Sequence, residues 1–246
     1  MTSPGTVIII GASSGIGYES ARIFASLGWK TGVMARREEP LRELASDFPG
    51  KIEFRTTDIT SENSVRDILS FIEELGKTDI VFLTAGTGWA NPSLNLEKDL
   101  MTVKTDVEGF VRVVDTAYGY FRQHNPHGQI AAISSVAGTK GIGISASYSA
   151  SKSFNSKYLE ALSQLSAIDG LHIAVTDIRP GFIRTALLDP SRSYPLLMKP
   201  EKAARQIVKA ILKRKKIAVI DTRWKIVVAF WRMIPGWLWR KMKIKL

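Results

Sequence analysis

The hydrophobic positions of this chain fall into short apolar runs that are separated by longer stretches with a different spacing. The clearest run, at residues 7–10, reads Val-Ile-Ile-Ile. A short run of β-branched residues without polar alternation is typical of a strand that is buried on both faces of a parallel sheet. We predict strands at residues 7–10, 30–34, 52–55, 80–83, 129–133, 171–177 and 217–220.

Between these runs, apolar residues three and four positions apart predict helices. The first helix is expected from about residue 16, with Gly28 as its C-terminal cap. Ser61 and Pro200 stand where an N-cap and a first-turn proline belong. The clearest of the other helices are predicted at residues 61–75, 99–123, 148–167 and 200–213.

Strands that alternate with helices in this way predict an α/β fold with a doubly wound parallel sheet, Rossmann-like and of about seven strands. No internal repeat, low-complexity tract or linker interrupts the alternation before about residue 220. We therefore expect one domain over residues 1–220 and a basic, tryptophan-rich appendage over residues 221–246.

The composition agrees with a globular α/β domain. The chain has 246 residues, of which 45% are hydrophobic, and a mean hydropathy of zero. It has no cysteine, which excludes disulfides and a thiolate nucleophile and is consistent with a reducing compartment. The N-terminus shows no secretory signal, because the apolar run at residues 7–10 is too short for one. We expect a cytoplasmic protein.

The positive charge is concentrated at one end of the chain. The net charge is +11, yet residues 199–246 hold 15 lysines and arginines against two acids, a net of +13. The preceding 198 residues hold 19 lysines and arginines against 21 acidic residues, a net charge of −2. This asymmetry indicates an anionic partner for the basic end alone.

A glycine-rich turn follows the first predicted strand and leads into the first helix. Such a turn lets a pyrophosphate approach the helix N-terminus, where free N–H groups and the helix dipole favour anions. Glycines also serve turns for conformational reasons alone, but the position between a strand and a helix favours nucleotide binding. The residues that would contact the nucleotide here are Gly11, Ser13, Ser14, Gly15, Ile16 and Gly17.

The end of the second strand predicts which nucleotide binds. An acidic residue at this point typically accepts hydrogen bonds from the adenosine ribose of NAD. This chain has Arg36 and Arg37 instead, and arginine forms bidentate, charge-assisted bonds with a 2′-phosphate. The alternative is a solvated basic loop, but the pair favours NADP(H) as the cofactor.

Tyr148 and Lys152 stand four residues apart at the start of a predicted helix, and therefore on one face of it. A free tyrosine has a pKa near 10. A neighbouring ammonium stabilises the phenolate, which makes the tyrosine a usable proton donor or acceptor near neutral pH. Ser134 and Ser135 end the fifth strand, and a hydroxyl there can bond a substrate carbonyl beside the tyrosine.

Together these motifs resemble the short-chain dehydrogenase/reductase family, whose glycine turn has the G-x-x-x-G-x-G spacing found here. The resemblance covers roughly residues 6–220. It implies that Ser135 polarises the substrate carbonyl, that Tyr148 transfers the proton and that Lys152 holds the ribose. It also implies cofactor contacts from Asp58, Ile59, Ala85, Gly86, Pro180, Gly181, Ile183 and Thr185.

Two positions depart from the family pattern. Thr84 stands where the family has asparagine before Ala-Gly, which is expected to change packing and little chemistry. Asp106 stands where the family has an asparagine that helps to hold a water in a proton relay. A carboxylate can still accept from such a water, but its charge would favour the ammonium form of Lys152. We include Asp106 among the catalytic candidates.

Other kinds of site lack support in the sequence. His124, His127 and His172 have no carboxylate or cysteine at ligand spacing, so we predict no metal site. The hypothesis of a serine hydrolase is set aside because the chain has no G-x-S-x-G motif. No recognised nucleic-acid-binding module accompanies the basic end, so we expect no nucleic-acid partner.

The basic end also holds four of the six tryptophans, at positions 224, 231, 237 and 239. Its apolar stretch at residues 226–231 is far too short to span a bilayer, which needs about 20 residues. Aromatic rings among cations are typical of a segment that lies on an anionic membrane, which would make the protein peripheral to it. The alternatives are that this segment packs against its own domain or a second subunit, or that it binds another anionic partner.

The sequence therefore predicts an NADP(H)-dependent oxidoreductase that interconverts a carbonyl and an alcohol, and we also expect a homo-oligomer. The competing hypothesis is a non-catalytic NADP-binding sensor or membrane-tethered interaction protein. The substrate is expected to be an apolar small molecule, because apolar residues follow Gly181, which comes after the sixth strand. These candidate substrate contacts are Leu187, Leu188, Leu196, Leu197 and Met198, together with Ile142 and Ile144.

Overall fold

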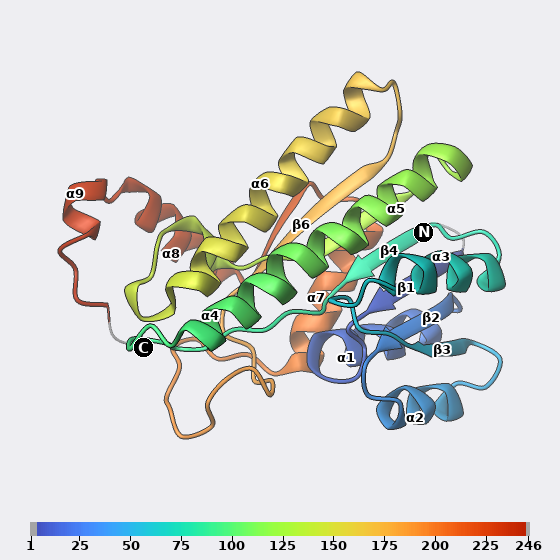
Figure 1. The fold of residues 1–246 in the computed structure, drawn as a ribbon, viewed down its shortest axis with the longest axis horizontal. Coiled ribbons are helices and arrows are strands. Elements are labelled where there is room, and N and C mark those ends of the chain that lie inside the picture. The colour runs from blue at the N-terminus through green and yellow to red at the C-terminus, as the bar shows by residue number, and fades with distance from the viewer. Residues whose placement is uncertain (1–3, 245–246) are drawn as a thin grey trace.

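The computed structural model describes residues 4–244 and contains one seven-stranded sheet in which all neighbouring strands run parallel (Figure 1). The strand order is β3-β2-β1-β4-β5-β6-β7, so the chain starts in the middle, builds one half and then returns to build the other. The strands are β1 Thr6–Ile10, β2 Lys30–Ala35, β3 Ile52–Thr56, β4 Ile80–Leu83, β5 Gln129–Ile133, β6 Ala174–Pro180 and β7 Ile217–Ile220. The predicted doubly wound parallel sheet is confirmed.

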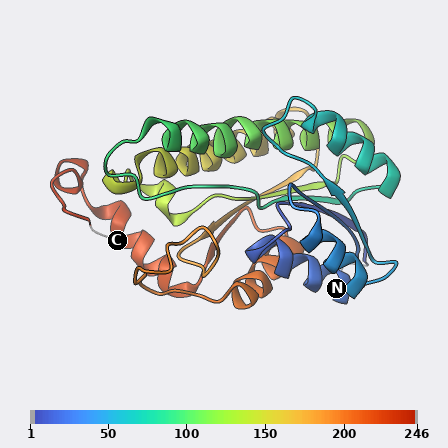
Figure 2. The same ribbon diagram turned by 60° about the horizontal axis from the view of Figure 1, so that its bottom comes forward.

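Helices cover both faces of the sheet, which gives three layers (Figure 2). Helices α1, α2 and α7 pack on one face, and α3, α5 and α6 pack on the other. The helices are α1 Gly15–Ser26, α2 Glu39–Asp47, α3 Ser64–Leu75, α4 Leu96–Val103, α5 Phe110–His124, α6 Ala146–Ile168, α7 Pro200–Leu212, α8 Thr222–Met233 and α9 Gly236–Trp239. Short turns of other helical types are η1 Lys104–Gly109, η2 Val136–Thr139 and η3 Gly143–Ser145.

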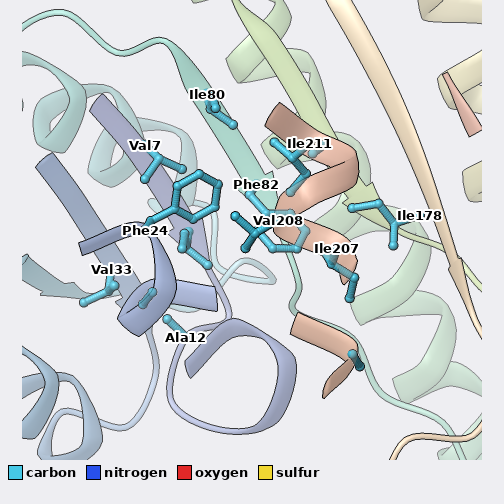
Figure 3. Close-up of a cluster of buried hydrophobic side chains, with 14 of the residues drawn as sticks. Val7, Ala12, Phe24, Val33, Ile80, Phe82, Ile178, Ile207, Val208 and Ile211 are labelled. Carbon is cyan, nitrogen blue, oxygen red and sulfur yellow. The ribbon is translucent and has the colours of Figure 1, made fainter. Parts of the chain in front are cut away.

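The central strand β1 explains why the sheet needs helices on both sides. All its residues are buried, and alternate side chains enter different clusters. Val7 and Ile9 pack toward α1 and α7, whereas Ile8 and Ile10 pack toward α3 and α5. Phe24 of α1 fills the first cluster beside Val7 (Figure 3). Full burial of one such side chain contributes about 1.5–3 kcal/mol.

Two predicted elements differ from the structure. The sixth strand was expected at residues 171–177 but runs over Ala174–Pro180, because the backbone N–H of Leu171 bonds the carbonyl of Ser166 and closes the end of α6. The helix expected at residues 99–123 is two helices, α4 and α5, joined by the wider turn η1. This turn carries Asp106, and therefore its geometry matters for the site.

The predicted cap at Ser61 is also wrong, because α3 begins three residues later, at Ser64. Ser61 instead belongs to the preceding turn, where its backbone N–H bonds the carbonyl of Asp58 and its hydroxyl accepts from the N–H of Asn63. A serine side chain commonly stabilises such a turn, so the sequence signal has two physical outcomes. Pro200 does occupy the first turn of α7, as expected.

The C-terminal segment returns to the domain after β7. Trp224 and Val228 of α8 are buried in a small cluster with Val136. Further along, the ring N–H of Trp239 donates to the carbonyl of Gly141 at 2.7 Å. Residues 222–239 thus pack against the domain. The division of the chain into two parts at residue 220 stays a prediction. Residues 245 and 246 of the predicted appendage lie outside the described residues. Among residues 4–244, no helix is long and apolar enough to cross a membrane.

Candidate active site

A cleft of about 1200 Å³ opens at the carboxyl ends of the strands. The chain reverses its direction of sheet building between β1 and β4, and parallel α/β sheets form their ligand crevice at such a point. Every predicted site residue except Asp106 lines this one cleft. They are Gly11, Ser13, Ser14, Gly15, Ile16, Gly17, Arg36, Arg37, Asp58, Ile59, Ala85, Gly86, Ser135, Tyr148, Lys152, Pro180, Gly181, Ile183 and Thr185.

The glycine-rich segment that runs from the end of β1 into the first turn of α1 has no room for a side chain at two of its positions. Gly11 has a φ of +101°, and a Cβ atom there would lie 2.3 Å from the backbone nitrogen of Ala85. A Cβ on Gly17 would lie 2.4 Å from the carbonyl oxygen of Gly11. Because α1 begins at Gly15, its first N–H groups face the cleft without helical partners. This arrangement can hold a pyrophosphate.

Positive charge gathers at the end of β2. Arg37 donates to the carbonyl oxygen and the hydroxyl of Ser13, at 3.1 and 3.2 Å, and so lies over the glycine turn. Arg36 contributes a positive field at Asp58, on the other side of this end of the cleft. Burial works to raise the pKa of Asp58, but hydrogen bonds from Thr60 and the charges of Arg36 and Lys104 together lower it. Asp58 is therefore an anion at neutral pH.

Tyr148 enters the cleft from the first turn of α6, beside Ser135 at the end of β5. The Ser135 hydroxyl accepts from the N–H of Ala137 at 3.1 Å and donates to the carbonyl of Pro180 at 3.3 Å, which fixes its position. Burial raises the pKa of Tyr148. The Lys152 ammonium and the Ser135 hydroxyl act against this rise, while the Asp106 carboxylate adds to it.

Lys152 lies one helical turn after Tyr148, with its Nζ atom 5.6 Å from the centre of the tyrosine ring. The same Nζ atom lies 2.9 Å from Oδ2 of Asp106, and both side chains are buried. Burial works to lower the pKa of Lys152, but attraction to Asp106 and Tyr148 outweighs it, so the pKa is raised. The backbone N–H of Thr87 donates to Oδ1 of Asp106 at 2.7 Å and holds the carboxylate in place. Asp106 therefore stands behind Lys152 and outside the lining of the cleft.

Comparison with known proteins places this geometry in a family. The family model described as short chain dehydrogenase matches residues 5–195. An uncharacterized oxidoreductase of Mycobacterium tuberculosis is 30% identical over 96% of this chain and 96% of its own length. An uncharacterized oxidoreductase of Listeria monocytogenes is 34% identical over 74% of this chain and 76% of its own length. The chain belongs to the short-chain dehydrogenase/reductase family.

Solved structures of low identity share the fold of this short-chain dehydrogenase/reductase. A structure titled "ElxO with NADP Bound" superposes with a TM-score of 0.78 at 21% identity, over 91% of this chain and 99% of the other. The structure of gox2181 gives a TM-score of 0.82 at 19% identity, over 92% of this chain and 97% of the other. Membership of the family makes this chain an oxidoreductase that binds a nicotinamide nucleotide.

Two further glycines, which were not among the predicted site residues, pack against Tyr148 and Lys152 in this dehydrogenase/reductase. A Cβ atom on Gly88 would lie 2.2 Å from Cδ2 of Tyr148, so the tyrosine ring packs directly on that backbone. A Cβ on Gly138 would lie 2.6 Å from the backbone carbonyl carbon of Lys152. The sequence signal for Gly88 was its position two residues after Gly86, but spacing alone does not reveal which ring a glycine contacts.

The part of the cleft beyond Tyr148 is lined mainly by apolar side chains, with the charged residues Lys98, Asp189 and Arg192 among them. Five of the seven predicted substrate contacts line it, namely Ile142, Ile144, Leu187, Leu188 and Leu196. The other two do not: Met198 is buried in the core beside α7, and Leu197 lies on a different part of the surface. The C-terminal segment, which sequence reasoning had not placed here, adds Trp224, Val227, Trp231 and Trp239 to the wall.

The histidines take no part in this site. The rings of His127 and His172 stack on each other with centroids 5.2 Å apart, and His124 stacks on Tyr120. Within residues 4–244 no group of three or more histidines, cysteines or carboxylates has the geometry of a metal site.

Proposed function

We propose that this protein is an NADP(H)-dependent oxidoreductase that interconverts a carbonyl and an alcohol on an apolar small molecule. One observation carries the proposal: Ser135, Tyr148 and Lys152 line the same cleft as the glycine turn that fits a pyrophosphate. A cleft with a phosphate-binding end, a tyrosine–lysine pair and an apolar end suits hydride exchange with an uncharged carbonyl compound.

In this proposal the chain's own residues bind the carbonyl and move its proton. The Ser135 hydroxyl stays positioned by the N–H of Ala137 and turns its one proton from the Pro180 carbonyl to the carbonyl oxygen of the substrate, which polarises the bond. The Tyr148 hydroxyl gives its proton to that oxygen in reduction and takes it back in oxidation. Lys152 would bond the cofactor ribose, and its charge works to lower the pKa of Tyr148 against the burial that raises it. The nicotinamide nucleotide, when bound, supplies or accepts the hydride.

The preference for NADP(H) rests on the end of β2. Arg36 and Arg37 follow Ala35 directly, where an NAD enzyme typically has an acid for the ribose hydroxyls. Both arginines line the cleft, and the Arg37 guanidinium already lies across the glycine turn at Ser13. A 2′-phosphate placed there would meet two cations, which supports NADP(H) over NAD(H).

The alternative function is a non-catalytic NADP-binding sensor or tethered interaction protein. It needs the glycine turn and the arginines but has no use for a serine, a tyrosine and a lysine gathered at the apolar end. A single-turnover experiment with NADPH and a panel of aldehydes and ketones separates the two. NADPH oxidation that disappears in Tyr148→Phe supports the enzyme, and tight NADPH binding without turnover on any carbonyl supports the sensor.

The proposal also includes the protein's surroundings: a homo-oligomer in the cytoplasm, peripheral to an anionic membrane. Exposed apolar side chains on neighbouring helices support the oligomer, among them Leu96 and Leu100 of α4 and Phe154 of α6. Sedimentation velocity of the purified protein tests the oligomeric state.

The charge of the C-terminal segment supports the attachment to an anionic membrane, because residues 222–246 hold seven cations and no acidic residue.

A further inference from the structure

Helix α8 is apolar on two opposite faces. Trp224 and Val228 face the domain and are buried. Ile226, Phe230 and Met233 stand at positions i, i+4 and i+7, and their side chains are 56%, 64% and 75% exposed. Residues at this spacing share one side of a helix. A helix that merely covers the domain would have polar residues on its outer side, so this second apolar stripe needs another explanation.

Exposed apolar side chains continue beyond α8. Trp237 of α9 is 65% exposed, although the neighbouring Trp239 is buried and bonded to the loop after β5. Leu238 and Met242 are exposed as well. These six residues, 226, 230, 233, 237, 238 and 242, form what we call the outer face. Figures 1 and 2 show that α8 and α9 project from one end of the molecule, beyond the helical layers.

Cations surround the outer face. Lys225, Arg232, Arg240 and Lys241 are exposed within the same segment, and no acid follows Asp221 in the sequence. Asp221 is occupied by an ion pair with Arg223. The outer face therefore combines exposed aromatic and aliphatic side chains with uncompensated positive charge.

This combination decides among possible partners. A second copy of the chain would bring an equally cationic surface, and the like charges would repel. Nucleic acid would suit the charges but not an apolar centre of isoleucine, phenylalanine and methionine. An anionic bilayer matches both features, because its surface attracts the cations and its interface accepts the aromatic and aliphatic side chains.

We propose that the outer face of residues 226–242 docks on the surface of an anionic bilayer. The inference rests on the membrane attachment in the proposed function and adds the face that makes the contact. On the opposite side of the same helix, Trp224, Val227 and Trp231 line the apolar end of the cleft. An α-helix with its side chains is only about 10 Å thick. Docking therefore brings the substrate end of the cleft to the bilayer, where apolar carbonyl compounds concentrate.

The test is co-sedimentation of the full chain with vesicles of phosphatidylcholine, alone or mixed equally with phosphatidylglycerol. The outer-face variant is Phe230→Ser with Met233→Ser. The matched control is Leu165→Ser with Ile168→Ser at the far end of α6, where the side chains are 38% and 74% exposed. NADPH binding, measured by fluorescence, confirms that each variant is folded.

We expect the wild type to bind the phosphatidylglycerol vesicles, the control to bind within about twofold of it, and the outer-face variant to bind about tenfold more weakly. If the wild type and the outer-face variant bind equally well, the membrane attachment stands, but the outer face does not make the contact. If the wild type ignores anionic vesicles, both fail. A dimer that the outer-face variant converts to monomer, with no vesicle binding, would replace the bilayer by a second copy.

Discussion

The Nζ atom of Lys152 lies 2.9 Å from Oδ2 of Asp106, and both groups are withdrawn from water. Between such groups the Coulomb interaction is only weakly screened, so each charge strongly affects its neighbours. The lysine that should lower the pKa of Tyr148 is thus paired with a carboxylate that raises it. The departure from the family pattern at residue 106 consequently opposes the activation of the tyrosine.

Asp106→Asn removes this opposing charge, and we expect it to move the pH dependence of the reaction. Alcohol oxidation needs the Tyr148 phenolate, so its rate rises as pH passes upward through the pKa of Tyr148. Because the carboxylate raises that pKa, its loss lowers it, and the rise occurs at lower pH in the variant. The pH profile of kcat for oxidation is the measurement. Asp115→Asn, which alters a carboxylate bonded to Tyr158 on the surface, should leave the profile in place. A shift to higher pH would contradict the assignment.

Tyr148→Phe deletes the transferable proton and keeps the ring. We expect reductase turnover to fall by about 100- to 10,000-fold, the range that a positioned acid contributes. NADPH affinity should stay within about twofold, because the glycine turn and the arginines are unchanged. Single-turnover kinetics and fluorescence titration measure the two effects separately. A variant with near wild-type rates would show that another group supplies the proton.

Arg36→Gln combined with Arg37→Gln tests the cofactor preference. The wild type should bind NADPH at least about tenfold more tightly than NADH, which corresponds to about 1.4 kcal/mol. The double variant should lose this preference through weaker NADPH binding, while its NADH affinity stays the same. Calorimetric titration of the wild type and the double variant with NADPH and with NADH measures these affinities. Arg66→Gln combined with Arg122→Gln, which removes two exposed arginines on α3 and α5, serves as the charge-matched control. Equal affinities of the wild type for both nucleotides would refute the preference.

Gly88→Ala tests the packing that holds the catalytic tyrosine. The new methyl group would lie 2.2 Å from the Tyr148 ring, so the ring must move. Displacement of a catalytic group by about 1 Å can cost on the order of 100-fold in rate. We expect kcat to fall with little change in NADPH affinity. Gly119→Ala in α5 is the control, since a Cβ atom there meets nothing within 4 Å. Equal loss of activity in both variants would remove Gly88 from the tyrosine's support.

Much of the fold and the cofactor end of the site could be predicted from the sequence. Parallel strands end at one edge of their sheet, so motifs that follow strands must gather there, whatever the details of the helices. This rule explains why Gly15, Asp58 and Ser135, which were predicted from separate motifs, line one cleft. It could not give the ion pair between Lys152 and Asp106, because the wider turn η1 sets the direction of the carboxylate.

The C-terminal segment was ambiguous for a physical reason. Tryptophans among cations have the same composition whether the rings cover a protein cleft or enter a bilayer interface. In the structure the two roles fall on different residues: Trp224 and Trp239 are buried, whereas Trp237 is exposed. Contacts such as those with Gly181 and Gly141 distinguish the buried rings, and contacts between residues so distant in the chain leave no periodic signal.

Trp224→Ala and Trp237→Ala separate these roles. A Cβ on Gly181 would lie 2.0 Å from the Trp224 ring nitrogen, so the indole packs against bare backbone directly after β6. Removing a buried tryptophan typically costs about 3–5 kcal/mol, and here the loss falls on the small cluster that anchors α8. We expect Trp224→Ala to release the segment, so that trypsin cleaves at Lys225 and Arg232 well before it cuts the wild type.

Trp237→Ala should be cleaved as slowly as the wild type, because its ring contributes little to the packing, yet it should bind anionic vesicles more weakly. Limited proteolysis followed by mass spectrometry identifies the cleavage sites, and the same preparations serve for vesicle sedimentation. If Trp224→Ala resisted trypsin like the wild type, the segment would be held by contacts other than the one at Gly181. If Trp237→Ala were the variant that released the segment, its ring would be a packing residue, and the outer face would lose its central aromatic contact.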